Sequence, residues 1–110
     1  MHGRFVPRSA GEKLRRAVMA LAGDQAELIA HAERAWASIT FAGSRHTLEL
    51  VFTGAPAVEA GERFVALLPD HEFAIAGRLV ASADVVAVDH VLLPAPRMTV
   101  TCEILLLEDA

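Results

Sequence analysis

The stretches TLELVF at residues 47–52 and TCEILL at residues 101–106 decide the fold, because they are two copies of one strand pattern. Each follows a second matching block, AVMALAGDQAELIA at 17–30 and RFVALLPDHEFAIA at 63–76. The upstream blocks are offset by 46 residues and the strand blocks by 54, so the second copy holds about eight extra residues, which we place at 89–96. A repeat of this length predicts a duplicated structural unit, here over residues 9–53 and 54–108.

Each unit is predicted to begin with a helix. Ser9 and Glu12 form a capping-box pattern, and Gly23 follows the apolar stripe as a stop signal. In the second unit, Pro56 suits the first helical turn and Pro69 ends the helix. The residues predicted to face the core are Leu14, Ala17, Val18 and Leu21 in the first helix and Ala57, Ala60, Phe64, Leu67 and Leu68 in the second.

Two strands are predicted after each helix, from the alternation of apolar and polar residues. The inner strands cover residues 46–53 and 97–107, and their partners cover 26–41 and 73–88. Turn residues Gly43 and Ser44 follow the first partner, and a loop with Pro94 and Pro96 follows the second. The alternation assigns one set of strand residues to the core: Leu48, Leu50, Phe52, Val100, Cys102, Ile104 and Leu106.

Residues 25–36 carry conflicting signals. Asp24 with Glu27 is a second capping-box pattern, and QAELIAHAERAWA is rich in helix formers, so local propensity favours a helix. The equivalent segment of the second unit, FAIAGRLVASADVV, has a glycine inside it and a valine-rich end, both typical of a strand. We therefore predict strands at both positions.

The resulting order predicts an α+β fold. The duplicated α-β-β unit forms a four-stranded antiparallel sheet with two helices on one face, and the strand order is 73–88, 97–107, 46–53, 26–41. Moving the first strand of a ferredoxin-like domain to its C-terminus gives this arrangement, so the fold is predicted to be circularly permuted ferredoxin-like. This comparison concerns topology and carries no functional residues with it.

Size and composition indicate a bacterial, cytoplasmic protein. The chain has one lysine, no asparagine and no tyrosine but many alanines and arginines, which is typical of GC-rich bacterial genomes. With 110 residues the chain is expected to be a single domain with its own core. It has no apolar run long enough to span a bilayer, no secretory signal and a single cysteine. Residues 1–8 are predicted to form a basic arm, and the first 16 residues have a net charge of +4 against −8 for the rest. Nucleic-acid contact through Arg4, Arg8, Lys13, Arg15 and Arg16 is one hypothesis, which the acidic body disfavours.

Two constellations are candidates for chemistry. Glu49 and Glu103 occupy equivalent positions on the polar face of the inner strands, where two close carboxylates can act as an acid and a base or hold a cation. His31, Glu33 and His46 are predicted to meet across the first hairpin as a ligand-binding cluster. The alternative for both is an ordinary solvated polar surface. The chain shows none of the common nucleophile, phosphate-binding or metal motifs, and we predict no cofactor and no resident metal.

Apolar residues outside the predicted core favour association. They include Val85–Val88, Val91–Leu93 and Leu105–Leu107, and also Trp36. A second subunit packed on the uncovered sheet face would bury them, so a non-enzymatic homodimer that binds a partner or a small ligand is the first functional hypothesis. In the alternative, long bent strands bury both faces within one chain. A small enzyme that uses Glu49 and Glu103 with His31 or His46 is the second hypothesis.

Overall fold

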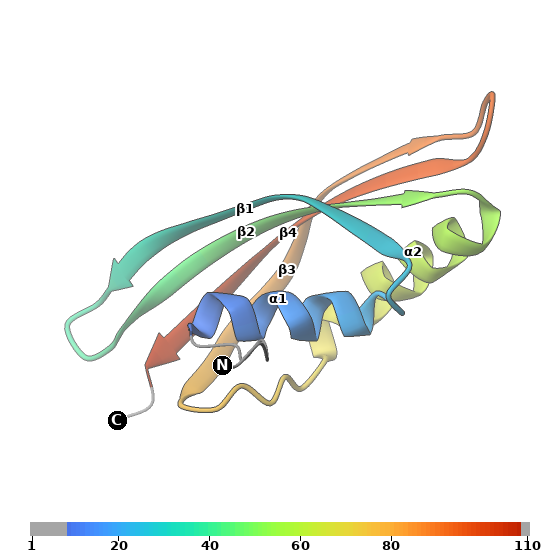
Figure 1. Cartoon of the computed structure of the whole chain (residues 1–110). Coiled ribbons are helices and arrows are strands. Elements are labelled where there is room, and N and C mark those ends of the chain that lie inside the picture. The colour runs from blue at the N-terminus through green and yellow to red at the C-terminus, as the bar shows by residue number, and fades with distance from the viewer. Residues whose placement is uncertain (1–8, 109–110) are drawn as a thin grey trace, which may run out of the picture.

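The computed structural model describes residues 9–108 as a helix, two strands, a helix and two strands (Figure 1). The first half comprises α1 (Ala10–Leu21), β1 (Ala26–Ala37) and β2 (Ala42–Thr53). The second half comprises α2 (Ala55–Leu67), the short 3-10 helix η1 (Leu68–Asp70), β3 (Arg78–Val91) and β4 (Arg97–Glu108). The predicted basic arm, residues 1–8, lies outside the described residues.

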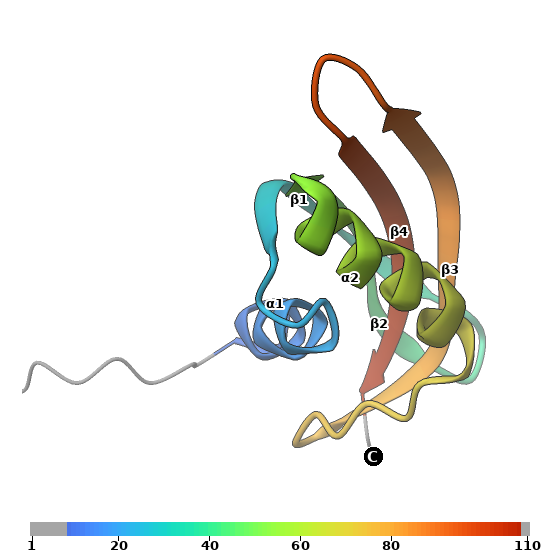
Figure 2. The ribbon, with the colours of Figure 1, turned by 90° about the vertical axis from the view of Figure 1, so that its right-hand side faces the viewer.

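The four strands form one antiparallel sheet in the order β1-β2-β4-β3, and both helices lie on the same face (Figures 1 and 2). The predicted α+β fold and strand order are thus confirmed, and they are compatible with the ferredoxin-like permutation. Residues 26–37 form a strand, as the second unit indicated and against their own helix propensity. We call the sheet face without helices the open face. Neither helix of the described chain is long and apolar enough to cross a membrane.

The core lies between the helices and the sheet. All seven strand residues assigned to it are fully buried, and Leu14, Val18 and Phe64 meet them from the helices. Burial on one side of the sheet explains why every second residue is apolar in β4 and, from Leu48 onward, in β2. Leu67 was also predicted to face the core but is 53% exposed, because it is the last residue of α2 and Leu68 in η1 takes the buried position.

The predicted turn at Gly43 and Ser44 is wrong. The chain turns at residues 38–41, where the Ser38 hydroxyl accepts hydrogen bonds from the Thr40 and Phe41 amides at 3.3 and 3.0 Å. Gly43 belongs to β2 and pairs with Leu107. A Cβ there would overlap the Leu106 carbonyl oxygen, so this glycine allows close strand approach and does not mark a turn.

Two further boundaries differ from the predictions. Residues 73–77 are not a strand: the chain turns at Gly77, whose φ is +77°, and β3 starts at Arg78. The buried side chain of Ile75 explains the apolar pattern of this segment, which serves the core as a connection. The extra residues of the second half were predicted at 89–96, and this position is wrong. They lie mainly in the link 68–77 between α2 and β3, and residues 89–91 continue β3.

The inner and outer strands differ in regularity. The pairing of β2 with β4 is continuous from Gly43↔Leu107 to Thr53↔Arg97. The outer strand β1 has a bulge at Ile29, and β3 has bulges at Ala81 and Val86. The sheet ends in two hairpins that point in opposite directions, and the β3–β4 hairpin projects beyond the helices (Figures 1 and 2).

Candidate functional site

Polar side chains interrupt the helix-covered face of the sheet next to α1. Ser44 and His46 continue the buried row of Leu48, Leu50 and Phe52 on β2. On β1, Glu33 pairs with His46 and His31 pairs with Leu48, so both lie on the same face. His46 is fully buried, the only polar residue among the described ones that is. The structure therefore brings the predicted trio His31, Glu33 and His46 to one place.

Four of the side chains here form a hydrogen-bonded series, which we call the histidine relay: Arg15, His31, His46 and Ser44. The Arg15 Nε and Nη2 atoms lie 3.3 and 3.2 Å from His31 Nδ1. His31 Nε2 lies 2.9 Å from His46 Nδ1, and His46 Nε2 lies 2.8 Å from Ser44 Oγ. Each ring thus uses both of its nitrogens.

The charge on Arg15 fixes the direction of this series. A guanidinium only donates hydrogen bonds, so His31 Nδ1 must be the acceptor. A neutral His31 then carries its hydrogen on Nε2 and donates it to His46 Nδ1. His46 in turn carries its hydrogen on Nε2 and donates it to Ser44 Oγ. The hydroxyl hydrogen of Ser44 remains available to a group outside the relay.

The surroundings of both imidazoles favour their neutral form. Burial lowers the pKa of His31 below its ordinary value, and the neighbouring His46 and Arg15 lower it further against the opposing effect of Glu33. Burial also lowers the pKa of His46, again opposed by Glu33. Because a protonated ring would have to donate from both nitrogens, it could not accept from its neighbour, so the relay requires neutral rings.

The relay does not resemble an activated serine. A nucleophilic serine needs an adjacent histidine nitrogen that accepts its proton. Here Arg15 enforces the opposite arrangement, in which His46 Nε2 already carries a hydrogen and Ser44 accepts it. The relay therefore orients the Ser44 hydroxyl, but His46 cannot accept its proton.

α1 approaches the relay at a glycine. A methyl group on Gly11 would lie 3.0 Å from Glu33 Oε1 and 3.5 Å from His46 Cε1. Arg15 follows one turn later on the same helix and therefore reaches the same strand residues. The start of the helix is fixed as predicted: Ser9 Oγ accepts from the Glu12 amide at 3.0 Å and donates to the Glu12 carboxylate at 3.1 Å.

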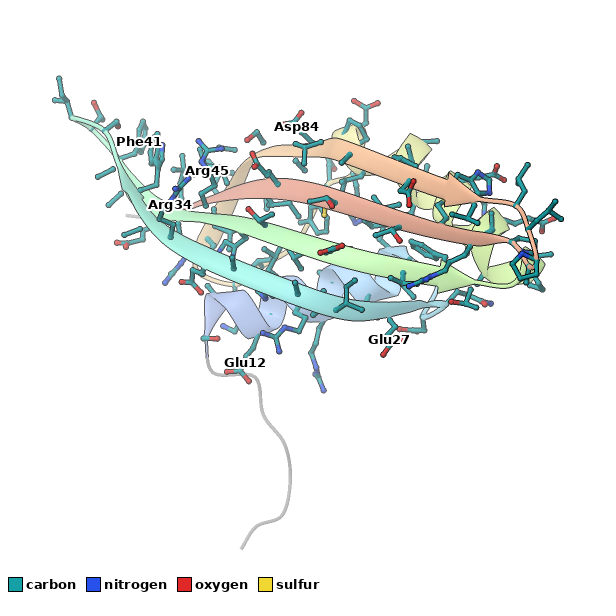
Figure 3. The ribbon with its side chains drawn as sticks, turned by 90° about the horizontal axis from the view of Figure 1, so that it is seen from above. Glu12, Glu27, Arg34, Phe41, Arg45 and Asp84 are labelled. Carbon is teal, nitrogen blue, oxygen red and sulfur yellow. The ribbon has the colours of Figure 1, made fainter. Side chains whose placement is uncertain are left out.

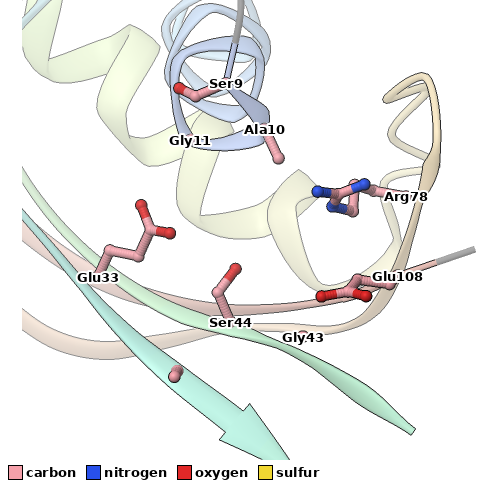
Figure 4. Close-up of a pocket in the computed structure, with 9 residues that line it drawn as sticks. Ser9, Ala10, Gly11, Glu33, Gly43, Ser44, Arg78 and Glu108 are labelled. Atoms are coloured by element: carbon pink, nitrogen blue, oxygen red, sulfur yellow. The ribbon is translucent and has the colours of Figure 1, made fainter.

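Ser44 borders a pocket of about 500 Å³ at the N-terminal end of α1 (Figure 4). Its walls come from α1 and from all four strands, with lining residues Ser9, Ala10, Gly11, Glu33, Ala35, Gly43, Ser44, Arg78 and Glu108. The lining is polar and of mixed charge, with Glu33 on one side and Arg78 beside Glu108 on the other (Figure 4). It offers a hydroxyl, carboxylates and a guanidinium to a small polar molecule.

Glu49 and Glu103 lie on the opposite, open face of the sheet. Glu49 pairs with Thr101 and Glu103 with Thr47, so the two carboxylates are diagonal neighbours on the inner strands. Arg45 Nη1 lies 3.9 Å from Glu103 Oε1, and both side chains are about one-third exposed. The sheet separates this pair from His31 and His46, so the acid-base combination of glutamates with histidines has no common site.

Within residues 9–108, no group of three or more His, Cys, Asp or Glu side chains is arranged to hold a metal ion. Cys102 is buried in the core, where desolvation raises the pKa of its thiol to about 11.

The sequence analysis missed Arg15 and Ser44 as members of the His31–His46 cluster. One signal pointed to Ser44, which shares the strand parity of His46. The sequence held no comparable signal for Arg15, whose contact with His31 depends on how α1 packs on β1.

Comparison with known proteins gives a likeness of fold. No model of a known protein family matches this sequence, and a search of curated proteins found no match. A solved structure described as the virion of a native gene transfer agent particle contains a similar chain. The two chains are 14% identical, the TM-score is 0.55, and the match covers 92% of each chain. At this identity the likeness shows the fold, an α+β module.

Proposed function

We propose that this protein is a non-enzymatic interaction module that self-associates, with a homodimer as the smallest assembly. The observation that carries this proposal is the grouping of exposed apolar side chains. Of ten large hydrophobic residues exposed among the described ones, seven lie toward the two ends of the sheet. They are Ile39, Phe41 and Leu79 at one end and Val88, Val91, Leu92 and Leu93 at the other. Grouped apolar residues of this kind mark interaction sites.

The open face supports the proposal at its β1–β2 loop end. Trp36, Gly43, Leu107 and Leu79 form one row across the four strands, and Phe41 lies beside it. Leu105 and Leu107 also point to this face, yet they are 9% and 8% exposed because neighbouring side chains already cover them. Trp36, Phe41 and Leu79 are left partly exposed above them. Aromatic residues next to arginines, here Arg34 and Arg45 (Figure 3), are enriched in protein interfaces.

The similar chain in the gene transfer agent virion supports the same proposal, since a virion is an assembly of protein subunits. A small structural role in such a particle is consistent with the described residues, in which His46 does not activate Ser44 and the sheet separates Glu49 and Glu103 from the histidines. The proposal keeps the bacterial, cytoplasmic setting predicted from the sequence.

Sedimentation velocity over a range of protein concentrations tests this function. We expect the wild-type sedimentation coefficient to rise with concentration and the Phe41→Asp/Leu79→Asp variant to remain monomeric. Leu67→Asp is the matched control, because Leu67 is equally exposed but lies on α2, away from both ends. A monomeric wild type, or a double variant that assembles like the wild type, would overturn the proposal.

A further inference from the structure

We infer that the partner of the open face is the β3–β4 hairpin of a second copy, which makes the contact head to tail. The inference rests on the proposed function and names its occupant. We call residues Trp36, Phe41, Leu79, Leu105 and Leu107 the tryptophan end of the sheet, and residues Val91, Leu92 and Leu93 the tip. The tip of one subunit packs on the tryptophan end of the next.

The two surfaces cannot meet within one chain. Leu107 pairs with Leu79 at the tryptophan end, and Arg97 pairs with Val91 at the tip, so ten residues of β4 separate them. At about 3.3 Å per strand residue this distance is about 33 Å. The tip also projects beyond the helices (Figures 1 and 2). Leu92 and Leu93 are 66% and 80% exposed, so the other described residues leave most of both side chains uncovered.

Charge indicates which partner fits the tryptophan end. Arg34 and Arg45 pair directly across β1 and β2, an arrangement that is unfavourable for two like charges. Arg45 has only the ion pair of 3.9 Å with the partly exposed Glu103, and Arg34 makes no hydrogen bond or ion pair with any other described residue. A partner that carries a carboxylate beside an apolar segment would relieve this repulsion.

The base of the tip carries a carboxylate beside an apolar segment, although Arg97 also lies on this face, opposite Val91. Asp89 lies on the open face of β3, two residues before Val91, and pairs with Thr99. A tip that inserts its aliphatic side chains beside Trp36 and Phe41 brings Asp89 toward Arg34 and Arg45 of the neighbouring subunit. The contact is small and weak on its own. Because its two sides differ, each added copy leaves one tip and one tryptophan end unused, so assembly continues until a ring closes or a filament forms.

Mixing two variants tests the inference. Leu92→Asp/Leu93→Asp disables the tip, and Arg34→Glu/Phe41→Asp disables the tryptophan end. All four side chains are exposed, so the folds should be kept, which circular dichroism and urea midpoints check. Each variant alone should be monomeric, and an equimolar mixture should form a heterodimer and nothing larger, because one intact tip then meets one intact tryptophan end. Leu67→Asp should assemble as the wild type does.

Charge reversal adds an independent arm. Arg34→Glu alone should weaken assembly, and Arg34→Glu combined with Asp89→Arg should restore it. Assembly by the tip variant alone, or a mixture that stays monomeric while the wild type assembles, would overturn the head-to-tail contact and leave the proposed self-association standing. A wild type that stays monomeric would overturn both.

Discussion

Replacing His46 with leucine should destabilise the protein more than replacing His46 and His31 together. The single substitution removes the hydrogen bonds of 2.9 Å to His31 and 2.8 Å to Ser44. The N–H of half-buried His31 is then left without an acceptor, which costs about 1–3 kcal/mol. Ser44 borders the pocket, where water can replace its lost partner. We therefore expect a loss of about 2 kcal/mol in the free energy of unfolding.

The double variant His31→Leu/His46→Leu removes the stranded donor as well. Two apolar side chains of similar size then face each other, an exchange that can be nearly neutral. Arg15 loses its acceptor but is exposed, so water can solvate its guanidinium. The double variant should lie within about 1 kcal/mol of the wild type, which makes the two substitutions strongly non-additive.

Urea unfolding near neutral pH measures the difference. For a domain of this size a slope of about 2 kcal/mol per molar urea is typical, so the His46→Leu midpoint should fall by roughly 1 M. His90→Leu is the control, because His90 is exposed and should leave the midpoint unchanged. If the double variant loses the sum of both single losses, the two imidazoles do not share a hydrogen bond and the relay is refuted.

Three further predictions follow from the same structure. The pKa values of His31 and His46 lie below the ordinary 6.5, so in acid the native state binds fewer protons than the unfolded chain. The contribution of the two rings to the free energy of unfolding should be complete above pH 6.5 and decrease below it. Equal pH slopes of stability in the wild type and in His31→Leu/His46→Leu would contradict this. Long-range 15N NMR should show both rings protonated at Nε2 in the wild type and a mixture of tautomers in Arg15→Met; a wild-type His46 protonated at Nδ1 would reverse the relay. The thiol of Cys102, with a pKa of about 11, should react with a disulfide reagent only as the protein unfolds, and rapid labelling of the native state would show that the inner strands open.

The sequence was most informative where one face of a strand is buried. The apolar residues of β2 and β4 alternate because the helices cover one side of the sheet, so Leu48 and Ile104 could be assigned to the core without a structure. The strand at 26–37 could be recognised only through the second unit, since pairing with β2 outweighs the local helix propensity of these residues.

The errors in the predicted boundaries have a common cause: tertiary contacts, not local structure, selected these residue types. Phe73 and Ile75 are apolar because they pack on the core from a connection, and the segment therefore resembles a strand. Gly43 is a glycine because the backbone of β4 lies against it, and it therefore resembles a turn residue. Arg15 joins the relay through contact between a helix and a strand 16 residues away in sequence. Pairing between strands could be predicted from alternation, whereas the docking of α1 on β1 could not.

The bulges in β1 and β3 limit how copies of this protein can polymerise. A regular outer strand offers a row of unpaired amides and carbonyls to an incoming strand, and this row is the template for fibril growth. The displaced residues Ile29, Ala81 and Val86 interrupt that row of backbone groups at both edges of the sheet. Sheets of different subunits are therefore not expected to fuse, and assembly is left to side chains, where salt and single charge substitutions can reverse it.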